Sequence, residues 1–466
     1  MTDSENQRAT SGAMRESDTS GASEGAREDT ERFTIFLVMF LVGWSDGSQG
    51  PLLPLLQEYY KIDYVIVSLI WIAITIGVII AAVSNIHLAD WIGFGLLTPL
   101  GALVQSTGYV LMCWGGPYPL FVIAYVFVGL GMGWQDAQVN SLSTRMPHAT
   151  TITFMLHAAY GLGATVSPFV ATPFAQRVTG RFYLYFITSL GLGIGTVITL
   201  ILTFQGRTED QIVGKRPDEG LEAVPGVLNS ATEPGTTPLD EHKGAVPAEA
   251  ESKGDIMLPT ELGEATGAEA RGSSAKYMAI LSTPKAYFLC IYIFLYMGVE
   301  VAIGGWATTF LIQERGGNSS SGYVTSGFFG GLTVGRIVLI PVTNRLGHRL
   351  SVYIYTVIAI GLELIVWLVP SLIGSALCFS LVGVALGPMY PSCVMIITEV
   401  MPTDLHTGTI GLMACIGFVG SAIMPFITGA IADRHGVWVL QPLMIALLTV
   451  SIGMWFLVAR ASAHKP

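Results

Sequence analysis

The chain has 466 residues, of which 51% are apolar and only 12% are charged. Soluble domains carry about 25% charged residues, so the composition excludes an ordinary soluble protein and indicates a membrane protein. The formal net charge is −10, and the acidic excess lies in two polar segments, residues 1–32 and 206–276. The acidity therefore gives no reason to expect nucleic-acid binding.

Apolar segments long enough to cross a bilayer recur along the chain. About 20 apolar residues span the hydrocarbon core as a helix, and by this measure the sequence predicts twelve transmembrane helices. Residues 1–32 lack the apolar core of a signal peptide, so the first span is expected to be retained. The predicted spans are 33–56, 65–86, 92–113, 118–144, 151–174, 182–204, 286–313, 322–344, 350–369, 371–399, 407–431 and 437–459.

These spans predict an all-α membrane protein with two six-helix bundles, at residues 33–204 and 286–460. Residues 205–285 between them are rich in Glu, Gly, Pro, Ala and Thr, and such a composition predicts a disordered acidic linker. The tail 1–32 is expected to be disordered as well. Arg and Lys are moderately enriched in the loops on the side of both termini, which favours a cytoplasmic tail, linker and C-terminus (461–466).

The two halves repeat short motifs at corresponding places. Residues 163–169 (GATVSPF) in the fifth span match residues 420–426 (GSAIMPF) in the eleventh. Val128 and Gly129 in the fourth span likewise match Val382 and Gly383 in the tenth. Each pair has the same direction through the membrane, as expected for a parallel repeat of six helices.

These motifs, together with several polar ones, make the chain resemble a major facilitator superfamily transporter. Within that superfamily, it resembles the fucose–galactose–glucose:proton symporter branch and its fungal relatives. The resemblance implies the major facilitator fold, with a central polar site lined by the first, fourth, seventh and tenth spans, and a plasma membrane location. The motifs that carry it are residues 43–51 (GWSDGSQGP), 131–140 (GMGWQDAQVN), 157–163 (HAAYGLG), 300–306 (EVAIGGW) and 387–391 (GPMYP).

Asp46 lies in the middle of the first span. An acid in hydrocarbon is costly and usually faces a cavity, a partner or an ion path. Gln49 is three residues further on and shares a side of the helix with it. The resemblance implies that Asp46 binds a polar solute or a proton, and the alternative is a structural hydrogen bond to another helix.

Asp136 and Asn140 are four residues apart and lie on one face of the fourth span. The resemblance implies a proton-coupling role for Asp136. This chain departs from the pattern of the branch, because the acid is Asp rather than Glu and Asn140 precedes Ser141 rather than a proline. Hydrogen bonding between helices is the alternative role.

Glu300 lies in the seventh span, six residues before Trp306. A buried carboxyl favours its protonated form, and proton binding is what a proton-coupled carrier requires. Trp306 is a candidate for stacking on a sugar-like or planar ligand, and Tyr390 in the tenth span for lining the cavity. Arg336, late in the eighth span, is expected to extend its charge toward the interface or to pair with an acid.

Two loops carry parts of the charged signature that gates major facilitator proteins on the cytoplasmic side. Asp90 follows the second span, and Arg345 and Arg349 follow the eighth. The resemblance implies that these charges divide a gating role between the two halves. The alternative is that they only solvate the helix ends.

These observations predict a secondary transporter that moves a small polar organic solute, sugar-like or related, by alternating access with proton coupling. Nothing resembles a phosphate loop, a metal cluster or a catalytic triad, so neither an enzyme nor a cofactor is expected. Proton-driven export of a fungal metabolite or drug is the alternative on the same fold. A nutrient sensor that does not transport is the alternative of another class.

Overall fold

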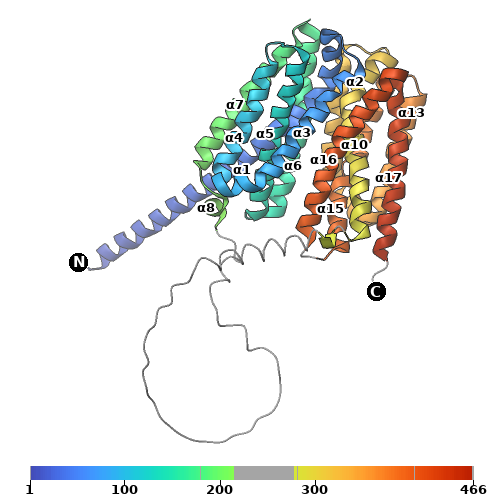
Figure 1. The fold of residues 1–466 in the computed structure, drawn as a ribbon. Coiled ribbons are helices and arrows are strands. Elements are labelled where there is room, and N and C mark those ends of the chain that lie inside the picture. Colours follow the sequence, from blue (N-terminus) through green and yellow to red (C-terminus); the bar gives the residue numbers. More distant parts are fainter. Residues whose placement is uncertain (1, 179, 215–277, 281, 403–404, 464–466) are drawn as a thin grey trace, which may run out of the picture.

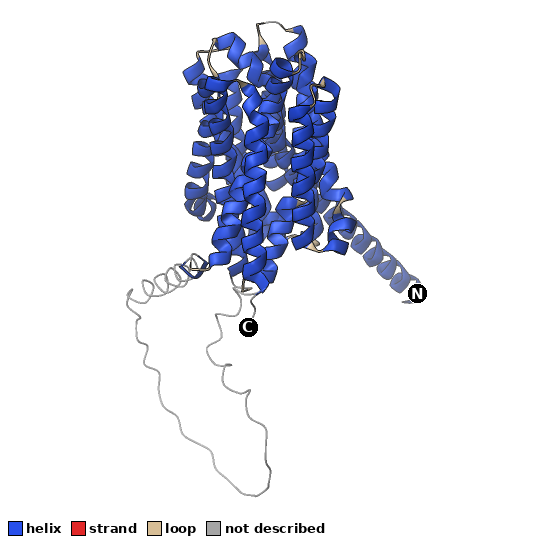
Figure 2. Ribbon diagram, turned by 90° about the vertical axis from the view of Figure 1, so that its right-hand side faces the viewer, coloured by secondary structure: helices blue, strands red, loops and turns tan. Residues whose placement is uncertain are grey.

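The computed structural model describes residues 2–178, 180–214, 278–280, 282–402 and 405–463. Every regular element in these ranges is a helix, as Figure 2 shows. This confirms the predicted all-α class. Figure 1 shows two groups of helices side by side, one from each half of the chain, with the start of α1 and the end of α17 at the same end of the bundle.

The helices of the N-terminal half follow one another with short connections. They are α1 (Thr2–Tyr60), α2 (Tyr64–Val67), α3 (Leu69–Ile92), α4 (Phe94–Met112), α5 (Tyr118–Arg145), α6 (Ala149–Arg177), η1 (Phe182–Leu184), α7 (Tyr185–Phe204) and α8 (Glu209–Val213).

The C-terminal half repeats this organisation. Its helices are α10 (Pro284–Glu314), η3 (Ser319–Gly322), α11 (Tyr323–Val338), α12 (Ile340–Leu346), α13 (His348–Leu368), α14 (Leu372–Leu386), α15 (Met389–Val400), α16 (His406–His435), η5 (Val437–Val439) and α17 (Leu440–Ala463).

Each predicted span coincides with one helix or with a broken pair of helices. Among the described residues, ten spans are long and apolar enough to cross a membrane, and the pair α11 and α12 makes an eleventh if counted together. This pair bends by 53° at Leu339, where Pro341 cannot donate a backbone hydrogen bond to the preceding turn. The predicted first span lies within α1, and its polar run from Trp44 to Gln49 makes it less apolar than the others.

The segments outside the bundles differ in part from expectation. Residues 2–32, expected to be a disordered tail, form the first part of α1. Near the bundle, ion pairs one turn apart support this helix, at Arg27–Glu31 (3.2 Å) and Arg32–Glu28 (2.7 Å). Most of the expected linker, residues 215–277, lies outside the described residues.

Close backbone contacts repeat in the two halves. Helix α1 packs on α6, and α10 packs on α16 in the same way. A Cβ atom at Gly163 of α6 would lie 2.1 Å from the Phe40 carbonyl oxygen, and one at Gly420 of α16 would lie 2.1 Å from that of Phe294. The repeated motifs therefore mark two equivalent places where only glycine permits the helices to touch.

The second repeated motif, which contains Gly129 and Gly383, also marks places where two helices touch. Helices α3 and α5 pack together, as do α11 and α14. A Cβ atom at Gly129 would lie 2.1 Å from the Ile74 carbonyl oxygen, and one at Gly383 would lie 2.1 Å from that of Phe328. The same interval of sequence separates Ile74 from Phe328 and Gly129 from Gly383, so the repeat extends to the packing partners.

The halves meet through α1 with α10, α6 with α11, and α3 with α16. At the first crossing a Cβ atom on Gly50 would lie 2.4 Å from the Gly304 carbonyl oxygen, so the two helices touch backbone to backbone. In the described part of the chain, two side-chain hydrogen bonds join the halves, Tyr64 to Gln313 and Gln176 to Ser320. Both lie at the end of the bundle remote from the chain termini (Figure 1).

The outer faces of the helices are apolar. Ile198 and Leu202 on α7 are 53% and 69% exposed, and Leu377 on α14 is 61% exposed. A soluble protein rarely leaves so many large apolar side chains in water. These faces are suited to contact with lipid.

Candidate functional site

Asp46 is held by a neighbouring helix. The Tyr160 hydroxyl of α6 donates a hydrogen bond of 2.8 Å to Asp46 Oδ2, and Gln49 Nε2 lies 3.4 Å from Asp46 Oδ1. Two glycines of α1 make the close approach possible. A Cβ atom at Gly43 would lie 1.9 Å from the Tyr160 carbonyl oxygen, and one at Gly47 would lie 2.2 Å from that of Ala164.

In the C-terminal half, Glu300 faces Arg336 of the neighbouring helix. Glu300 Oε1 of α10 lies 4.0 Å from Arg336 Nη2 of α11, with the two side chains 11% and 22% exposed. This distance is too long for a hydrogen bond. Arg336 Nε is buried and has no hydrogen-bond partner among the described residues. The expected pairing of Arg336 with an acid is therefore present as a long ion pair.

The polar side chains at residues 135–140 of the fourth predicted span have two different roles. Asn140 donates a hydrogen bond of 2.9 Å to Asp136 Oδ1, and both residues are partly exposed. Gln135 and Gln138 are buried, and they bond to α4 and α3 at Gln105 (2.7 Å) and Asn85 (2.9 Å). Helix–helix bonding thus accounts for these two glutamines, while Asp136 and Asn140 keep surface outside that packing.

The three acids belong to one electrostatic cluster. Asp46 is close enough to interact with both Glu300 and Asp136. Tyr160 interacts with Asp46, Glu300 and Arg336, and Tyr390 of α15 interacts with Asp136 and Arg336. We refer to these residues as the central cluster, which consists of Asp46, Asp136, Tyr160, Glu300, Arg336 and Tyr390.

The repeat places two of the acids at equivalent positions. The interval between Asp46 and Glu300 is the same as that between Phe40 and Phe294, or between Gly50 and Gly304. The first of these acids lies on α1 and the second on α10, the helices that cross at the glycine contact. The cluster thus has one acid from each half beside the contact between the halves.

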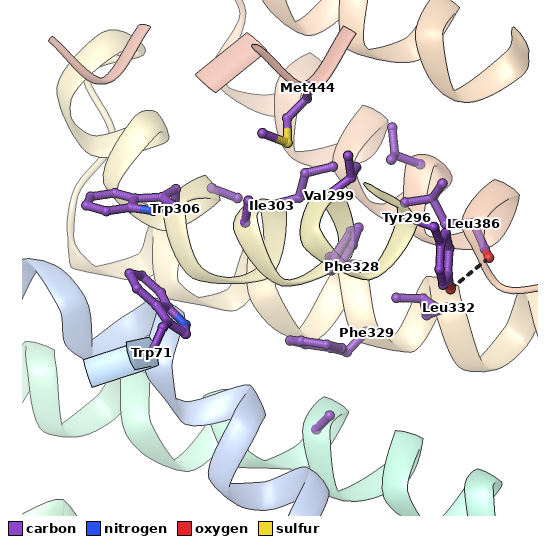
Figure 3. Packing of buried hydrophobic residues seen from close by; sticks show 14 of the residues in the cluster. Trp71, Tyr296, Val299, Ile303, Trp306, Phe328, Phe329, Leu332, Leu386 and Met444 are labelled. Atoms are coloured by element: carbon purple, nitrogen blue, oxygen red, sulfur yellow. Dashed lines mark hydrogen bonds between the residues drawn. The ribbon is translucent and has the colours of Figure 1, made fainter. Parts of the chain in front are cut away.

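Trp306 lies apart from the central cluster. Its side chain is fully buried, and its Nε1 donates a hydrogen bond of 3.0 Å to the Pro425 carbonyl oxygen. The ring centroid is 5.6 Å from that of Trp71 and 5.5 Å from that of Tyr64. Figure 3 shows Trp306 and Trp71 facing each other across the halves, with Tyr296 further along α10. The structure places Trp306 in packing between the halves.

The predicted gating charges do not meet across the halves in this structure. Arg349 pairs with Glu399 at 3.3 Å, and both residues belong to the C-terminal half. Asp90 and Arg345 are exposed, and neither forms an ion pair with another described residue. On the same side, Arg145 pairs with Glu209 and Asp210 of α8. The shared gating role stays a prediction.

Sequence reasoning missed Tyr160 as a partner of Asp46. Tyr160 belongs to the motif at residues 157–163, but a tyrosine in a membrane helix gives no sign of which helix it faces. The equivalence of Asp46 and Glu300 had a readable signal, because both follow a phenylalanine by six residues and precede a glycine by four. In the described residues, no group of three or more His, Cys, Asp or Glu side chains is arranged to hold a metal.

The model of the Major Facilitator Superfamily matches residues 35–425 and 288–466 of the chain. Bypass of stop codon protein 6 of Saccharomyces cerevisiae is 27% identical over 441 residues, which cover 89% of this chain and 80% of that protein.

Two solved structures show the same fold. A bacterial homolog of the human lysosomal transporter Spinster, in an inward-facing conformation, has a TM-score of 0.66 at 11% identity, covering 94% of this chain and 98% of that one. The transporter FucP, in the outward conformation, has a TM-score of 0.57 at 13% identity, covering 93% and 99%. The chain belongs to the Major Facilitator Superfamily of membrane transporters.

Proposed function

We propose that this protein is a secondary active transporter that moves a small polar organic solute, coupled to protons, by alternating access. One observation carries the proposal: the central cluster joins ionisable groups of both halves beside the crossing of α1 and α10. Carboxyls in the membrane interior are rare and mark solute, ion or proton pathways. A site shared by both halves can be opened to one side at a time when the halves tilt.

The three carboxyls have different roles in this proposal. Asp46 and Glu300 are the proton and solute groups of the two halves, since each lies near the contact between α1 and α10. Asp136, held by Asn140, lies in the same electrostatic cluster and is the third candidate for the proton. Tyr390 and Gln49 contribute polar atoms for the solute.

We infer that the structure represents one state of the alternating-access cycle. The two hydrogen bonds between the halves lie at the end remote from the chain termini. With the termini in the cytoplasm, these bonds would hold the outer end closed, and the inner end would be the one that opens in this state. We assign the protein to the plasma membrane with a cytoplasmic tail, linker and C-terminus.

Proton movement in reconstituted vesicles tests the proposal. Purified protein is placed in liposomes that contain a pH-sensitive dye, and sugars, polyols and organic acids are added in turn. We expect one class of solute to drive a pH change inside the vesicles, and Asp46→Asn and Glu300→Gln to abolish it.

Glu363→Gln is the matched control, because Glu363 is a fully buried acid of α13 outside the central cluster. This variant should keep the activity of the wild type. If no solute in the panel moves protons while the protein is folded, or if Asp46→Asn performs like the wild type, the coupling proposal is wrong.

A further inference from the structure

Arg336 is the basic side chain of the central cluster, and its pairing is incomplete. A guanidinium has five N–H donors and cannot lose its charge, so burying it without acceptors is costly. Here the nearest carboxylate oxygen, on Glu300, is 4.0 Å away, and Nε has no partner among the described residues. Tyr296 of α10 also lies close to the guanidinium, but no carboxylate among the described residues is within hydrogen-bond distance of Arg336.

The other acids of the cluster have donors of their own. Asp46 accepts from Tyr160 at 2.8 Å, and Asp136 accepts from Asn140 at 2.9 Å. The remaining titratable groups that face Arg336 from the elements packed against it carry no negative charge near neutral pH. They are Tyr296 of α10, Tyr160 and His157 of α6, and Tyr390 of α15.

From this pairing we infer that the solute is a small organic anion whose carboxylate binds Arg336. The inference rests on the proposed transport function and names the class of its substrate. The planar fork of a guanidinium matches both oxygens of a carboxylate, and such paired hydrogen bonds are among the strongest in proteins. When Glu300 is protonated, the hydroxyl groups of a neutral sugar would leave the buried charge of Arg336 without a counter-ion.

Glu300 gives this site a link to protons. An ionised Glu300 competes with the solute for Arg336, and its proximity to a second carboxylate is unfavourable. When a proton binds to the Glu300 carboxyl, Arg336 is released to bind the carboxylate of the solute. One proton and one anion then occupy the site together, and they leave together when Glu300 is ionised again and returns to Arg336.

Binding to the purified protein in detergent tests this without requiring transport. The probes are carboxylates and their neutral amides, namely benzoate with benzamide, lactate with lactamide and quinate with quinamide, and also glucose. Isothermal titration at several pH values is expected to show that at least one carboxylate binds at least about tenfold more tightly than its amide.

The variants separate recognition from stability. Arg336→Gln should weaken carboxylate binding at least about tenfold, and Arg336→Lys should recover part of it. Glu300→Gln should bind the carboxylate with little change between acid and neutral pH. If Arg336→Gln fails to fold because Glu300 is left unpaired, the double variant Arg336→Gln/Glu300→Gln removes both charges and serves in its place. Glu363→Gln should bind like the wild type.

The inference is overturned if amides or glucose bind the wild type as tightly as the carboxylates, if no carboxylate of the panel binds the folded protein, or if the Arg336 variants bind normally. Proton-coupled uptake of a neutral solute by Arg336→Gln would refute it and leave the proposed function intact. Carboxylate binding without any proton movement would refute the coupling and leave the recognition intact.

Discussion

Replacing Gly163 by alanine should loosen the contact between α1 and α6. The added Cβ atom would lie 2.1 Å from the Phe40 carbonyl oxygen, whereas ordinary contact begins at about 3.4 Å. The obstacle is backbone on both sides, so no side-chain rotation can relieve it. The helices must therefore separate by more than an ångström, which also disturbs the neighbouring bond from Tyr160 to Asp46.

Two opposing contributions to the free energy of unfolding decide whether Gly163→Ala destabilises the protein. Overpacking of a close contact costs about 1–3 kcal/mol, whereas alanine recovers at most about 1 kcal/mol of helix propensity over glycine. Subtracting the gain from the cost leaves a loss of about 0–2 kcal/mol in the free energy of unfolding. Gly420→Ala should give a similar loss, because the equivalent Cβ atom would lie 2.1 Å from the Phe294 carbonyl oxygen.

Unfolding of the purified protein by SDS in mixed micelles, followed by tryptophan fluorescence, measures these changes. The matched control is Gly195→Ala on α7, where nothing lies within 4 Å of the added Cβ atom. This control should unfold at the same SDS fraction as the wild type or at a higher one. Equal midpoints for the Gly163 and Gly195 variants would refute the reasoning.

Three further outcomes are expected. Tyr160→Phe removes the 2.8 Å hydrogen bond to Asp46 and should lower solute-driven proton movement about tenfold while the protein stays folded. An unchanged rate would show that this tyrosine takes no part in the site. Trp306→Phe should lower the SDS midpoint and leave the apparent KM of uptake unchanged, because the indole packs between the halves; a raised KM at wild-type stability would place it in the solute site instead. A disulfide between Tyr64→Cys and Gln313→Cys in a cysteine-free background should stop uptake until it is reduced. Full transport with the disulfide intact would contradict the proposal that the outer end opens during transport.

The sequence predicted the architecture well because membrane helices have a simple signal. A run of about 20 apolar residues has few alternatives in a bilayer, so all the predicted spans coincide with helices. The repeated glycine motifs also had a physical meaning that the structure makes visible, since Gly129, Gly163, Gly383 and Gly420 are the places where backbones touch.

The arrangement of the site was less accessible from the sequence. The sequence does not say which face of a helix contacts which neighbour. It therefore could not distinguish the packing residues Gln135 and Trp306 from the cluster residues Asp136 and Glu300. The helical structure of residues 2–32 was missed because their composition resembles that of a disordered segment, whereas the pairs of Arg27 and Arg32 with Glu31 and Glu28 favour a helix.

The contact between Gly50 and Gly304 bears on how the halves can move. Side chains that interlock fit best at one angle, so turning one helix over another would raise the energy step by step. Two glycine backbones present a smooth surface and resist such turning far less. If the halves tilt as proposed, we expect the crossing of α1 and α10 to act as the pivot, and a larger residue at position 50 to hold the two halves at a single tilt.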